Sequence, residues 1–222
     1  MPKSVVMALS GGLDSCVLLA RFLAEGYDVT AVSFMYNSKH NAHEQEAARA
    51  IAEHYGITLR VVDVSPIFDT MSCSLLNNGT DLPEGHYAED NMKSTVVPGR
   101  NLVFASILAS IAESTQSAYI ALGVHAGDHF IYPDCRPRFV DALDRVVNAS
   151  TDFAVDAIAP FVDISKAAIV KMGLELNAPL YLTRTCYSTG DKACGKCGSC
   201  NERLEAFKVN NAADPAEYVS KR

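Results

Sequence analysis

The sequence predicts an α/β protein built on a doubly wound, mainly parallel five-stranded sheet, with a small metal-binding segment at its carboxyl end. Three observations support this prediction. Short runs rich in Val, Ile and Leu alternate with helical apolar spacing, a Ser-Gly-Gly turn follows the first run, and four of the seven cysteines fall within fifteen positions near the end. Alternating strands and helices imply parallel strands joined by right-handed crossovers. We expect an α/β domain at residues 1–180 and a cysteine segment at residues 181–222.

The first strand and the turn after it carry the densest pattern. Residues 5–9 predict a buried strand, residues 10–15 a glycine turn and residues 16–23 an amphipathic helix, with Cys16 a small residue on its first turn. Glycines let the backbone approach a ligand closely, and the free N–H groups of the helix point into the same space, which makes an anion cradle. Asp14 and Ser15 either cap the helix or contact a phosphate and its magnesium. A capped helix after an ordinary turn also explains any one of these residues.

This turn resembles a known nucleotide-binding motif. Six consecutive residues match the SGGxDS pattern, the PP-loop of the N-type ATP pyrophosphatases: Ser10, Gly11, Gly12, Leu13, Asp14 and Ser15. No Gly-Lys-Ser or Gly-Lys-Thr follows the glycines, so the turn is not a Walker A loop. The resemblance implies an adenine nucleotide alpha hydrolase-like fold and ATP binding at this turn. It also implies ATP cleavage between the α and β phosphates, adenylation of a carboxylate or carbonyl oxygen, and pyrophosphate release.

The next two strands extend the predicted sheet. Residues 29–36 predict a second strand, residues 42–55 a helix closed by Gly56, and residues 57–64 a third strand. Apolar residues on both sides of the second strand indicate burial on both faces. Because ligands of such sheets bind at the carboxyl ends of the strands, we expect the end of the second strand, residues 33–36, to wall the adenine site, with Ser33 and Met35 as ATP contacts.

A long segment precedes the next helix. Residues 65–98 have no clear period and contain turn signals, which is typical of either a lid or a disordered connection; we favour a lid. It leads into Val-Pro-Gly-Arg-Asn at residues 97–101, followed by an apolar helix. That helix start aims free N–H groups and Arg100 at an anion, whereas the alternative is a turn with a solvated Arg.

The fourth strand leads into a polar loop. Residues 118–124, which include Gly123, predict the strand, and ionisable residues follow it closely, as in an active-site loop. His125 and His129 are either ligand contacts or hydrogen-bonded structural residues. Asp134 suits a planar amidine-like edge and Arg136 suits a substrate carboxylate. Cys135, between these two, is interpreted as pocket wall rather than nucleophile.

The remaining α/β elements follow in order. Residues 137–148 predict a helix, a fifth strand lies within residues 153–162, and Ser165 caps a helix that begins with Lys166. A lysine at a helix start is unfavourable with the helix dipole, so either an anionic ligand lies nearby or the side chain is exposed at a small cost.

The carboxyl-terminal cysteines predict a metal site. Two overlapping Cys-x-x-Cys spacings and a preceding cysteine place four thiolates within reach of one ion: Cys186, Cys194, Cys197 and Cys200. Four sulfur ligands with no open position indicate a structural Zn²⁺, and an iron–sulfur cluster is the alternative.

Composition limits the function. Nineteen Lys and Arg against 26 Asp and Glu give a net charge of −7, which disfavours nucleic acid and favours a small-molecule substrate. The amino terminus runs directly into the first strand, without room for a signal peptide, and no uninterrupted apolar run approaches the roughly 18 residues of a membrane span. We expect a cytoplasmic protein that does not bind membranes.

The motifs together resemble the 7-cyano-7-deazaguanine synthase family, the preQ0 synthases (QueC family) of queuosine precursor biosynthesis. The likeness spans nearly the whole chain, including residues 202–207 and 214–215. It implies that ATP adenylates 7-carboxy-7-deazaguanine, that ammonia displaces AMP to form an amide, and that a second ATP activates the amide oxygen to leave the nitrile. No glutaminase segment is visible, so free ammonium or a separate donor is implied, and a homodimer is a further expectation.

The resemblance also implies residue roles. The catalytic residues are Asp14, Ser15 and Lys166; further ATP contacts are Ser10, Gly11, Gly12, Leu13, Ser33, Met35, Arg100 and Gly123; the substrate contacts are Asn101, Tyr132, Asp134 and Arg136. The expected cofactors are ATP, Mg²⁺ and Zn²⁺. Two positions depart from the family pattern. Cys16 replaces Thr or Ala, and Arg184 replaces an aromatic residue, so Arg184 either stacks on a planar base or faces solvent.

Three other functions remain open from sequence. One is a PP-loop tRNA thiolase, which needs a basic RNA surface. Another is a non-enzymatic zinc module, which leaves the phosphate cradle unexplained. The third is an enzyme of the same chemistry that acts on a different carboxylate, including a protein terminus.

Overall fold

A five-stranded parallel sheet forms the centre of the molecule. The computed structural model describes residues 3–79 and 90–219, and for residues 90–92 the backbone alone. The sheet order is β3-β2-β1-β4-β5, and every neighbouring pair is parallel. The strands are β1 Ser4–Ala8, β2 Asp28–Met35, β3 Leu59–Asp63, β4 Tyr119–Ala121 and β5 Asp156–Ile158. This confirms the predicted doubly wound α/β fold.

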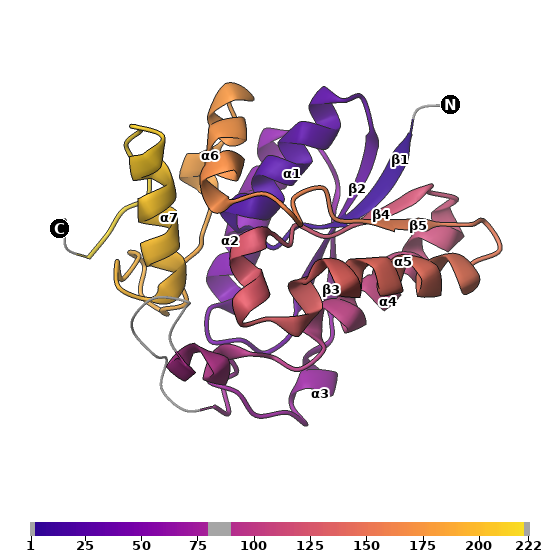
Figure 1. Ribbon diagram of the computed structural model, residues 1–222, viewed down its shortest axis with the longest axis horizontal. Helices are drawn as coiled ribbons and strands as arrows, with labels where there is room; N and C mark the ends of the chain where they lie inside the picture. Colours follow the sequence, from indigo (N-terminus) through magenta and orange to yellow (C-terminus); the bar gives the residue numbers. More distant parts are fainter. Residues whose placement is uncertain (1–2, 80–89, 220–222) are drawn as a thin grey trace.

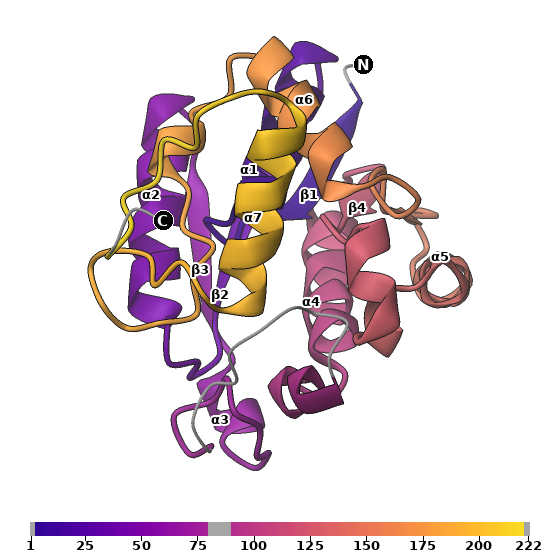
Figure 2. The ribbon, with the colours of Figure 1, turned by 60° about the vertical axis from the view of Figure 1, so that its left-hand side comes forward.

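Helices cover both faces of the sheet (Figure 1). The α-helices are α1 Leu13–Ala24, α2 Asn41–His54, α3 Ser65–Phe68, α4 Arg100–Thr115, α5 Pro137–Ala149, α6 Lys166–Glu175 and α7 Gly198–Val209. Short 3₁₀ turns are η1 Asp90–Thr95, η2 Ala126–Phe130, η3 Pro133–Cys135 and η4 Leu180–Leu182. The helices α4 and α5 pack on one face, whereas α1, α2 and α6 pack on the other, with α7 against α6 (Figure 2).

The central strand explains why the core has two halves. Side chains alternate along a strand, so Val6 packs with α4 and α5 while Val5 and Met7 pack with α1 and α6. All three are fully buried. A strand that is apolar on both faces can stand only in the middle of a two-sided sheet, as the sequence pattern predicted.

The sheet order fixes where a ligand can bind. Strand order reverses between β1 and β4, so the turns after these two strands diverge to opposite faces and leave a crevice at their carboxyl ends. The glycine turn follows β1, and the polar loop that begins at His125 follows β4. The two segments that the sequence marked for chemistry therefore meet at the switch point.

The segment between β3 and α4 is more structured than its lack of periodicity indicated. It contains α3 and η1, and residues 73–76 are buried, with Cys73, Leu75 and Leu76 packed into the α4 side of the core. A bridge joins Leu76 to Ser38 after β2. Both ends of the segment are thus anchored, and the middle of the expected lid, residues 80–89, lies outside the described residues.

The helix α4 is strongly apolar. With the turn before it, Lys93–Thr115 is 23 residues long, and by length and composition alone it could cross a membrane. Helices in the core of a globular protein have the same length and composition. Phe104, Ala105 and Leu108 are buried against the sheet, while Ser106 and Ser110 face outward, as in a core helix.

Candidate active site

The glycine turn is held tightly against α2. Gly11 has φ +83°, and a Cβ there would lie 2.4 Å from the carbonyl oxygen of Glu44, so only glycine fits. Within the turn, the Gly12 N–H donates to Ser10 Oγ at 3.2 Å, and the Ser15 hydroxyl donates to the Gly12 carbonyl at 3.0 Å. The hydrogen bonds of the two serine side chains stabilise the conformation of the loop, so its shape does not depend on a ligand.

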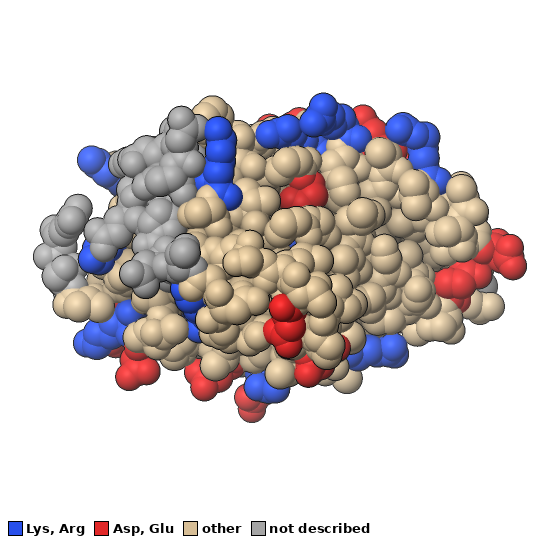
Figure 3. Space-filling model, turned by 90° about the horizontal axis from the view of Figure 1, so that it is seen from below, with Lys and Arg blue, Asp and Glu red and all other residues tan. Residues whose placement is uncertain are grey.

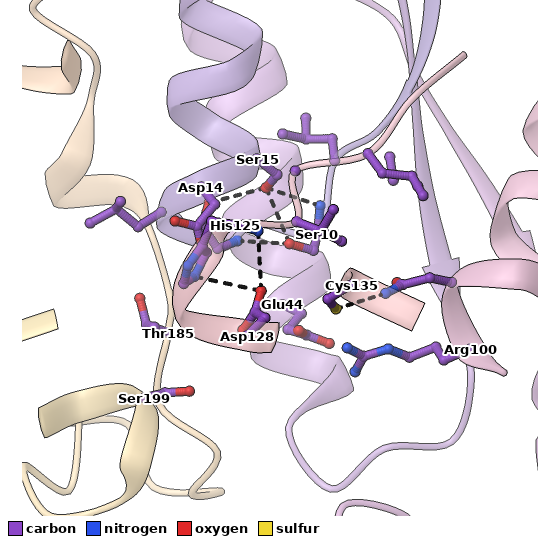
Figure 4. A pocket seen from close by; sticks show the side chains of 18 of the residues that line it. Ser10, Asp14, Ser15, Glu44, Arg100, His125, Asp128, Cys135, Thr185 and Ser199 are labelled. Atoms are coloured by element: carbon purple, nitrogen blue, oxygen red, sulfur yellow. Dashed lines mark hydrogen bonds and ion pairs between the residues drawn. The ribbon is translucent and has the colours of Figure 1, made fainter. Parts of the chain in front are cut away.

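The turn opens into a cavity of about 200 Å³ (Figure 4). Ser10, Gly12, Leu13, Asp14 and Ser15 line it, and Gly11 lies behind, in contact with α2. The cavity also collects residues from β2, α2, α4, the β4 loop, α6 and the segment before α7. Its two ends differ in chemistry.

One end holds a buried cluster of charges around Lys166. The Lys166 Nζ lies 2.6 Å from Asp14 Oδ2 and 3.6 Å from Glu202 Oε2, and the side chain is only 7% exposed. Burial alone raises the pKa of Asp14, but the charge and the hydrogen bond of Lys166 hold it below its usual value, so Asp14 is ionised at neutral pH. Burial likewise lowers the pKa of Lys166, but the same carboxylates raise it above its usual value, so the pair is ionic.

His125 lies beside this pair as a neutral ring. Burial and the Lys166 charge lower the pKa of its imidazole. Its Nδ1 accepts the Gly127 N–H at 3.1 Å, so we assign the ring proton to Nε2. That nitrogen faces the carboxylates of Asp128 at 3.6 Å and Glu202 at 3.8 Å. His125 is therefore a structural donor inside the cluster, and His129 does not line the cavity.

The other end of the cavity is aromatic and carries Arg100. Phe34 and Phe104 stack with ring centroids 4.1 Å apart, and Tyr36 packs edge-on against Phe104. The Arg100 Nη1 donates to the Tyr36 hydroxyl at 3.4 Å, and its guanidinium lies 5.7 Å from the centre of the Tyr36 ring. No carboxylate among the described residues pairs with Arg100, so an anionic ligand would complete this end of the cavity.

Within the predicted adenine wall, residues 33–36, Ser33 and Met35 do not line the cavity. Ser33 is buried on the α2 side, where its hydroxyl accepts from Gln45 at 2.7 Å, and Met35 is 37% exposed at the end of β2. Phe34 and Tyr36 of the same stretch line the cavity, together with Val32. Neighbouring side chains of a strand point to opposite faces, so only every second residue of β2 faces the cavity.

Asp134 and Arg136 also lie outside the cavity lining. The Asp134 carboxylate accepts the Asn101 N–H at 2.9 Å, which satisfies a free donor in the first turn of α4. The Arg136 Nε donates to the His129 carbonyl at 2.8 Å. Their neighbours Asn101 and Tyr132 do line the cavity, as does Gly123. Asp134 and Arg136 thus support the site rather than form its surface.

Arg184 neither faces open solvent nor lies free to stack on a base. Its guanidinium donates to the carbonyls of Ser188, Gly190 and Asp191 at 3.0, 2.6 and 2.8 Å. Its backbone N–H donates to the Gly11 carbonyl at 2.8 Å. One residue therefore connects the glycine turn to the loop that precedes Cys194.

Cys16 and Cys135, both buried in the α/β part, are poor nucleophiles. Burial raises the pKa of the Cys16 thiol to about 12. Burial, with the charges of Asp128 and Asp134 nearby, raises the pKa of Cys135 further, and its sulfur accepts from the Asn101 amide at 3.3 Å. Cys135 lines the cavity as wall, as predicted.

The four predicted metal ligands converge. The sulfur atoms of Cys186, Cys194, Cys197 and Cys200 all lie within 4.8 Å of one another, and Cys194 Sγ is 3.9 Å from Cys200 Sγ. Tetrahedral ligands with Zn–S bonds of about 2.3 Å stand about 3.8 Å apart. The N–H groups of Ser188 and Cys194 donate to the Cys186 sulfur, which supports a thiolate there. The donor set fits a structural zinc ion.

Sequence reasoning missed several cavity residues. Glu202 comes from α7, far along the chain from Asp14, and no local motif marks it. Glu44 sits on α2 within an ordinary polar face, and Asp128 within the β4 loop. Thr185 and Ser199 flank the metal ligands and point into the same space (Figure 4). Their only signal was proximity to Cys186 and Cys200.

Comparison with known proteins identifies the family of this chain. The family model described as "Queuosine biosynthesis protein QueC" matches residues 4–211. A 7-cyano-7-deazaguanine synthase from Marinomonas sp. (strain MWYL1) is 44% identical over 98% of this chain and 99% of its own. The synthases of Pseudoalteromonas atlantica and Caldicellulosiruptor saccharolyticus are 44% and 43% identical, covering 98% and 96% of this chain and 100% and 94% of their own.

Among solved structures, the NMN synthetase of Francisella tularensis shares the fold. It superposes with a TM-score of 0.53 at 14% identity, covering 96% of this chain and 79% of that one. At that identity the likeness concerns the fold alone. The family match and the near full-length relatives show that this chain belongs to the queuosine biosynthesis protein QueC family.

Proposed function

We propose that this protein converts 7-carboxy-7-deazaguanine to 7-cyano-7-deazaguanine with two molecules of ATP and one of ammonia. The first ATP adenylates the carboxylate, and ammonia then displaces AMP to give the amide. The second ATP activates the amide oxygen, and loss of AMP and a proton leaves the nitrile. The observation that carries the proposal is one cavity with a phosphate-type glycine turn and a lysine cluster at one end and an aromatic wall at the other.

The turn and the lysine suit the nucleotide. The N–H groups at the start of α1 and the ammonium of Lys166 would stabilise charge on the phosphates as pyrophosphate leaves. Ser10, Ser15 and Gly123 would border the phosphates, and Arg100 would neutralise an anion at the far end. The protein's main contribution is then to align the reactants and hold developing negative charge.

Two metal ions belong to the proposal. Asp14 Oδ1 is buried without a partner, while Oδ2 is taken by Lys166, so one carboxylate oxygen is left for Mg²⁺ bound with the triphosphate. Such an ion would offset phosphate charge. The four cysteines would hold Zn²⁺, whose chemistry here is structural: it would fasten the segment that brings Glu202, Thr185 and Ser199 to the cavity.

The remaining expectations are proposals about context. We infer free ammonium or a separate donor protein as the nitrogen source, a cytoplasmic location and a homodimer. A small-molecule substrate is favoured over nucleic acid by the net charge of −7. Figure 3 agrees on the face that it shows, since basic side chains there stand among acidic ones and form no continuous track.

The test is a mass measurement on the base. Purified protein is incubated with ATP, ammonium and 7-carboxy-7-deazaguanine, and the base is followed through acid, amide and nitrile, with AMP counted in parallel. We expect the nitrile with two AMP per turnover. AMP release without any change in the base, or turnover only with another carboxylic acid, would refute the proposed substrate.

A further inference from the structure

The proposed substrate needs a hydrogen-bond acceptor in the cavity for the donors along one edge of its base. A 7-deazaguanine presents two neighbouring N–H donors, N1–H and the 2-amino group, along its amidine edge. A carboxylate is the side chain that accepts both at once. Asp134 was predicted for this role, but its carboxylate accepts the Asn101 N–H and lies outside the cavity lining. The inference that follows rests on the proposed function.

Among the described residues, four carboxylates line the cavity: Asp14, Glu44, Asp128 and Glu202. Three of them surround Lys166 and His125. Asp14 and Glu202 lie within 4 Å of the Lys166 nitrogen, and Asp128 lies 3.6 Å from His125 Nε2. Each of these three carboxylates thus faces a donor of that cluster at the phosphate end. Glu44 is the one carboxylate of this set that stands apart from it.

Glu44 stands at the aromatic end and points into the cavity. Its carboxylate is 16% exposed, and it lies 3.4 Å from His40 Nε2, with no Lys or Arg partner among the described residues. Figure 4 shows the Glu44 carboxylate and the Arg100 guanidinium directed into the same part of the cavity from opposite sides. Glu44 and Arg100 form no ion pair with each other, so the space between them is suited to a molecule with donors on one edge and acceptors on another.

The backbone of Glu44 is fixed relative to the glycine turn. Its carbonyl oxygen would lie 2.4 Å from a Cβ on Gly11, so the first turn of α2 rests directly on the PP-loop. His40, only 3% exposed, lies between the Tyr36 hydroxyl and the Glu44 carboxylate, with Nε2 3.4 Å from each. His40, at the start of the same helix, therefore fixes the position of the Glu44 carboxylate beside the glycine turn.

We propose that Glu44 binds the amidine edge of the 7-deazaguanine substrate, and that His40 is the positioning residue that orients it. The aromatic walls hold the plane of the base, and the C7 carboxylate projects toward the PP-loop. The adenine of ATP fits Glu44 poorly, because its Watson–Crick edge places the N1 acceptor beside the amine, opposite a carboxylate oxygen. Glu44 therefore selects guanine-type bases and has no role in holding ATP.

The test measures two bases with the wild type and with Glu44→Gln. The first base is 7-carboxy-7-deazaguanine. The second base is 7-carboxy-7-deazahypoxanthine, which keeps N1–H and lacks the 2-amino group. In the wild type, kcat/KM should favour the guanine-type base by on the order of 100-fold, since one charge-assisted hydrogen bond is lost in the analogue. In Glu44→Gln the side-chain amide opposes the 2-amino group, and the preference should fall to about threefold or less, with the KM for ATP unchanged.

Matched variants separate a local effect from general damage. Glu46→Gln lies on the same helix with a side chain that is 75% exposed, and it should keep the wild-type preference. Glu44→Asp retains the charge at a shorter reach and should restore part of the preference, which covers the case in which Glu44→Gln folds poorly. His40→Ala should lower the preference for the guanine-type base without abolishing turnover. If the role of His40 were purely structural, the variant would have a lower melting temperature and kcat/KM would fall equally for both bases.

Calorimetric binding of the guanine-type base, without ATP, distinguishes the two proposals. Binding that depends on Glu44, together with no turnover, would refute the reaction and support the inference. Normal turnover with wild-type preference in Glu44→Gln would overturn the inference and leave the reaction standing. A changed KM for ATP in Glu44→Gln, or loss of preference in Asp134→Asn alone, would also overturn it.

Discussion

Lys166 is a buried cation whose charge is balanced by carboxylates from two distant segments. Asp14 comes from the first turn of α1 and Glu202 from α7. Burial of an unpaired ammonium would cost several kcal/mol, so this lysine needs at least one of the two carboxylates that the fold brings to it. The unfavourable position of Lys166 at a helix start, noted from sequence, is explained by these anions and by the anionic nucleotide that we propose beside them.

At the residue scale we predict that Asp14→Asn stops catalysis without unfolding the protein. AMP release should fall by on the order of 100-fold or more, because Lys166 and the proposed Mg²⁺ lose their ionised partner. The melting temperature should change little, since Lys166 keeps Glu202 at 3.6 Å. Pyrophosphate release and thermal melting measure the two effects.

Asp141→Asn is the control, since Asp141 is exposed on α5, away from the cavity. A folded Asp14→Asn protein that releases AMP at the wild-type rate would remove the assignment of residues 10–15 as the ATP site.

At the scale of elements, Arg184 connects the glycine turn to residues 188–191, the loop that precedes Cys194. We predict that Arg184→Ala weakens metal binding, because three carbonyls of the loop before Cys194 lose their donor. Loss of an outer partner of a metal site costs about 10–100-fold in affinity. Competition with a coloured chelator measures it.

Arg145→Ala, exposed on α5, serves as the reference for loss of a surface arginine. Equal zinc affinity in Arg184→Ala and Arg145→Ala would mean that the loop is held by the cysteines alone.

A second element-scale feature is the buried pair that fixes the end of the chain to α7. The Arg203 guanidinium, 2% exposed, donates to Asp214 at 2.9 Å and to the hydroxyls of Thr183 and Thr185 at 2.7 and 2.9 Å. Burial raises the pKa of Asp214, but Arg203 and Tyr218 hydrogen bonds lower it more, so its folded pKa lies below the unfolded one. Such a group stabilises the fold above its unfolded pKa of about 3.9, and the stability is lost as pH falls through the folded pKa.

We therefore predict that Asp214→Asn lowers the free energy of unfolding by about 3–5 kcal/mol at pH 7, the usual cost of breaking a buried ion pair. The difference from wild type should narrow as the pH falls below about 4. Urea unfolding at a series of pH values measures it. A difference that stays constant down to pH about 2.5 would show that Asp214 contributes as a hydrogen-bond acceptor only.

At the scale of the whole molecule, the four-cysteine segment contributes side chains to the cavity. The helix α7 begins between Cys197 and Cys200, and two positions after Cys200 it places Glu202 against Lys166. Further along, Ala206 and Phe207 pack in the same core as α1 and α6. The start of α7 thus lies within the four-cysteine cluster, while its middle packs in the core with α1 and α6.

We predict that metal removal abolishes activity while the sheet stays folded. After chelation, amides of residues 186–202 should exchange hydrogen rapidly, whereas those of β1, β2 and α1 should stay protected, because metal affinity is local folding energy. Cys194→Ala should give the same exchange pattern with less than one metal per chain. Full activity in a metal-free protein would contradict this coupling.

The sequence could predict the features whose partners are close along the chain. The turn of residues 10–15 and the Cys-x-x-Cys spacings are local patterns, and both converge as expected. Alternation between strands and helices is likewise local and led to the correct sheet. Ser33 and Met35 show the limit, because the pattern of β2 is apolar on both faces and does not say which face borders the cavity.

What the sequence determined by itself is the α/β class, the glycine turn of residues 10–15 and the convergence of the four cysteines, since each depends on spacing within a few residues. Only the tertiary structure decided which side chains share the cavity. Glu202 and Glu44 enter it because α7 and α2 pack beside the glycine turn, whereas Asp134 is used by the first turn of α4. Contacts between distant segments depend on how helices pack across the sheet, and short-range patterns do not encode that packing.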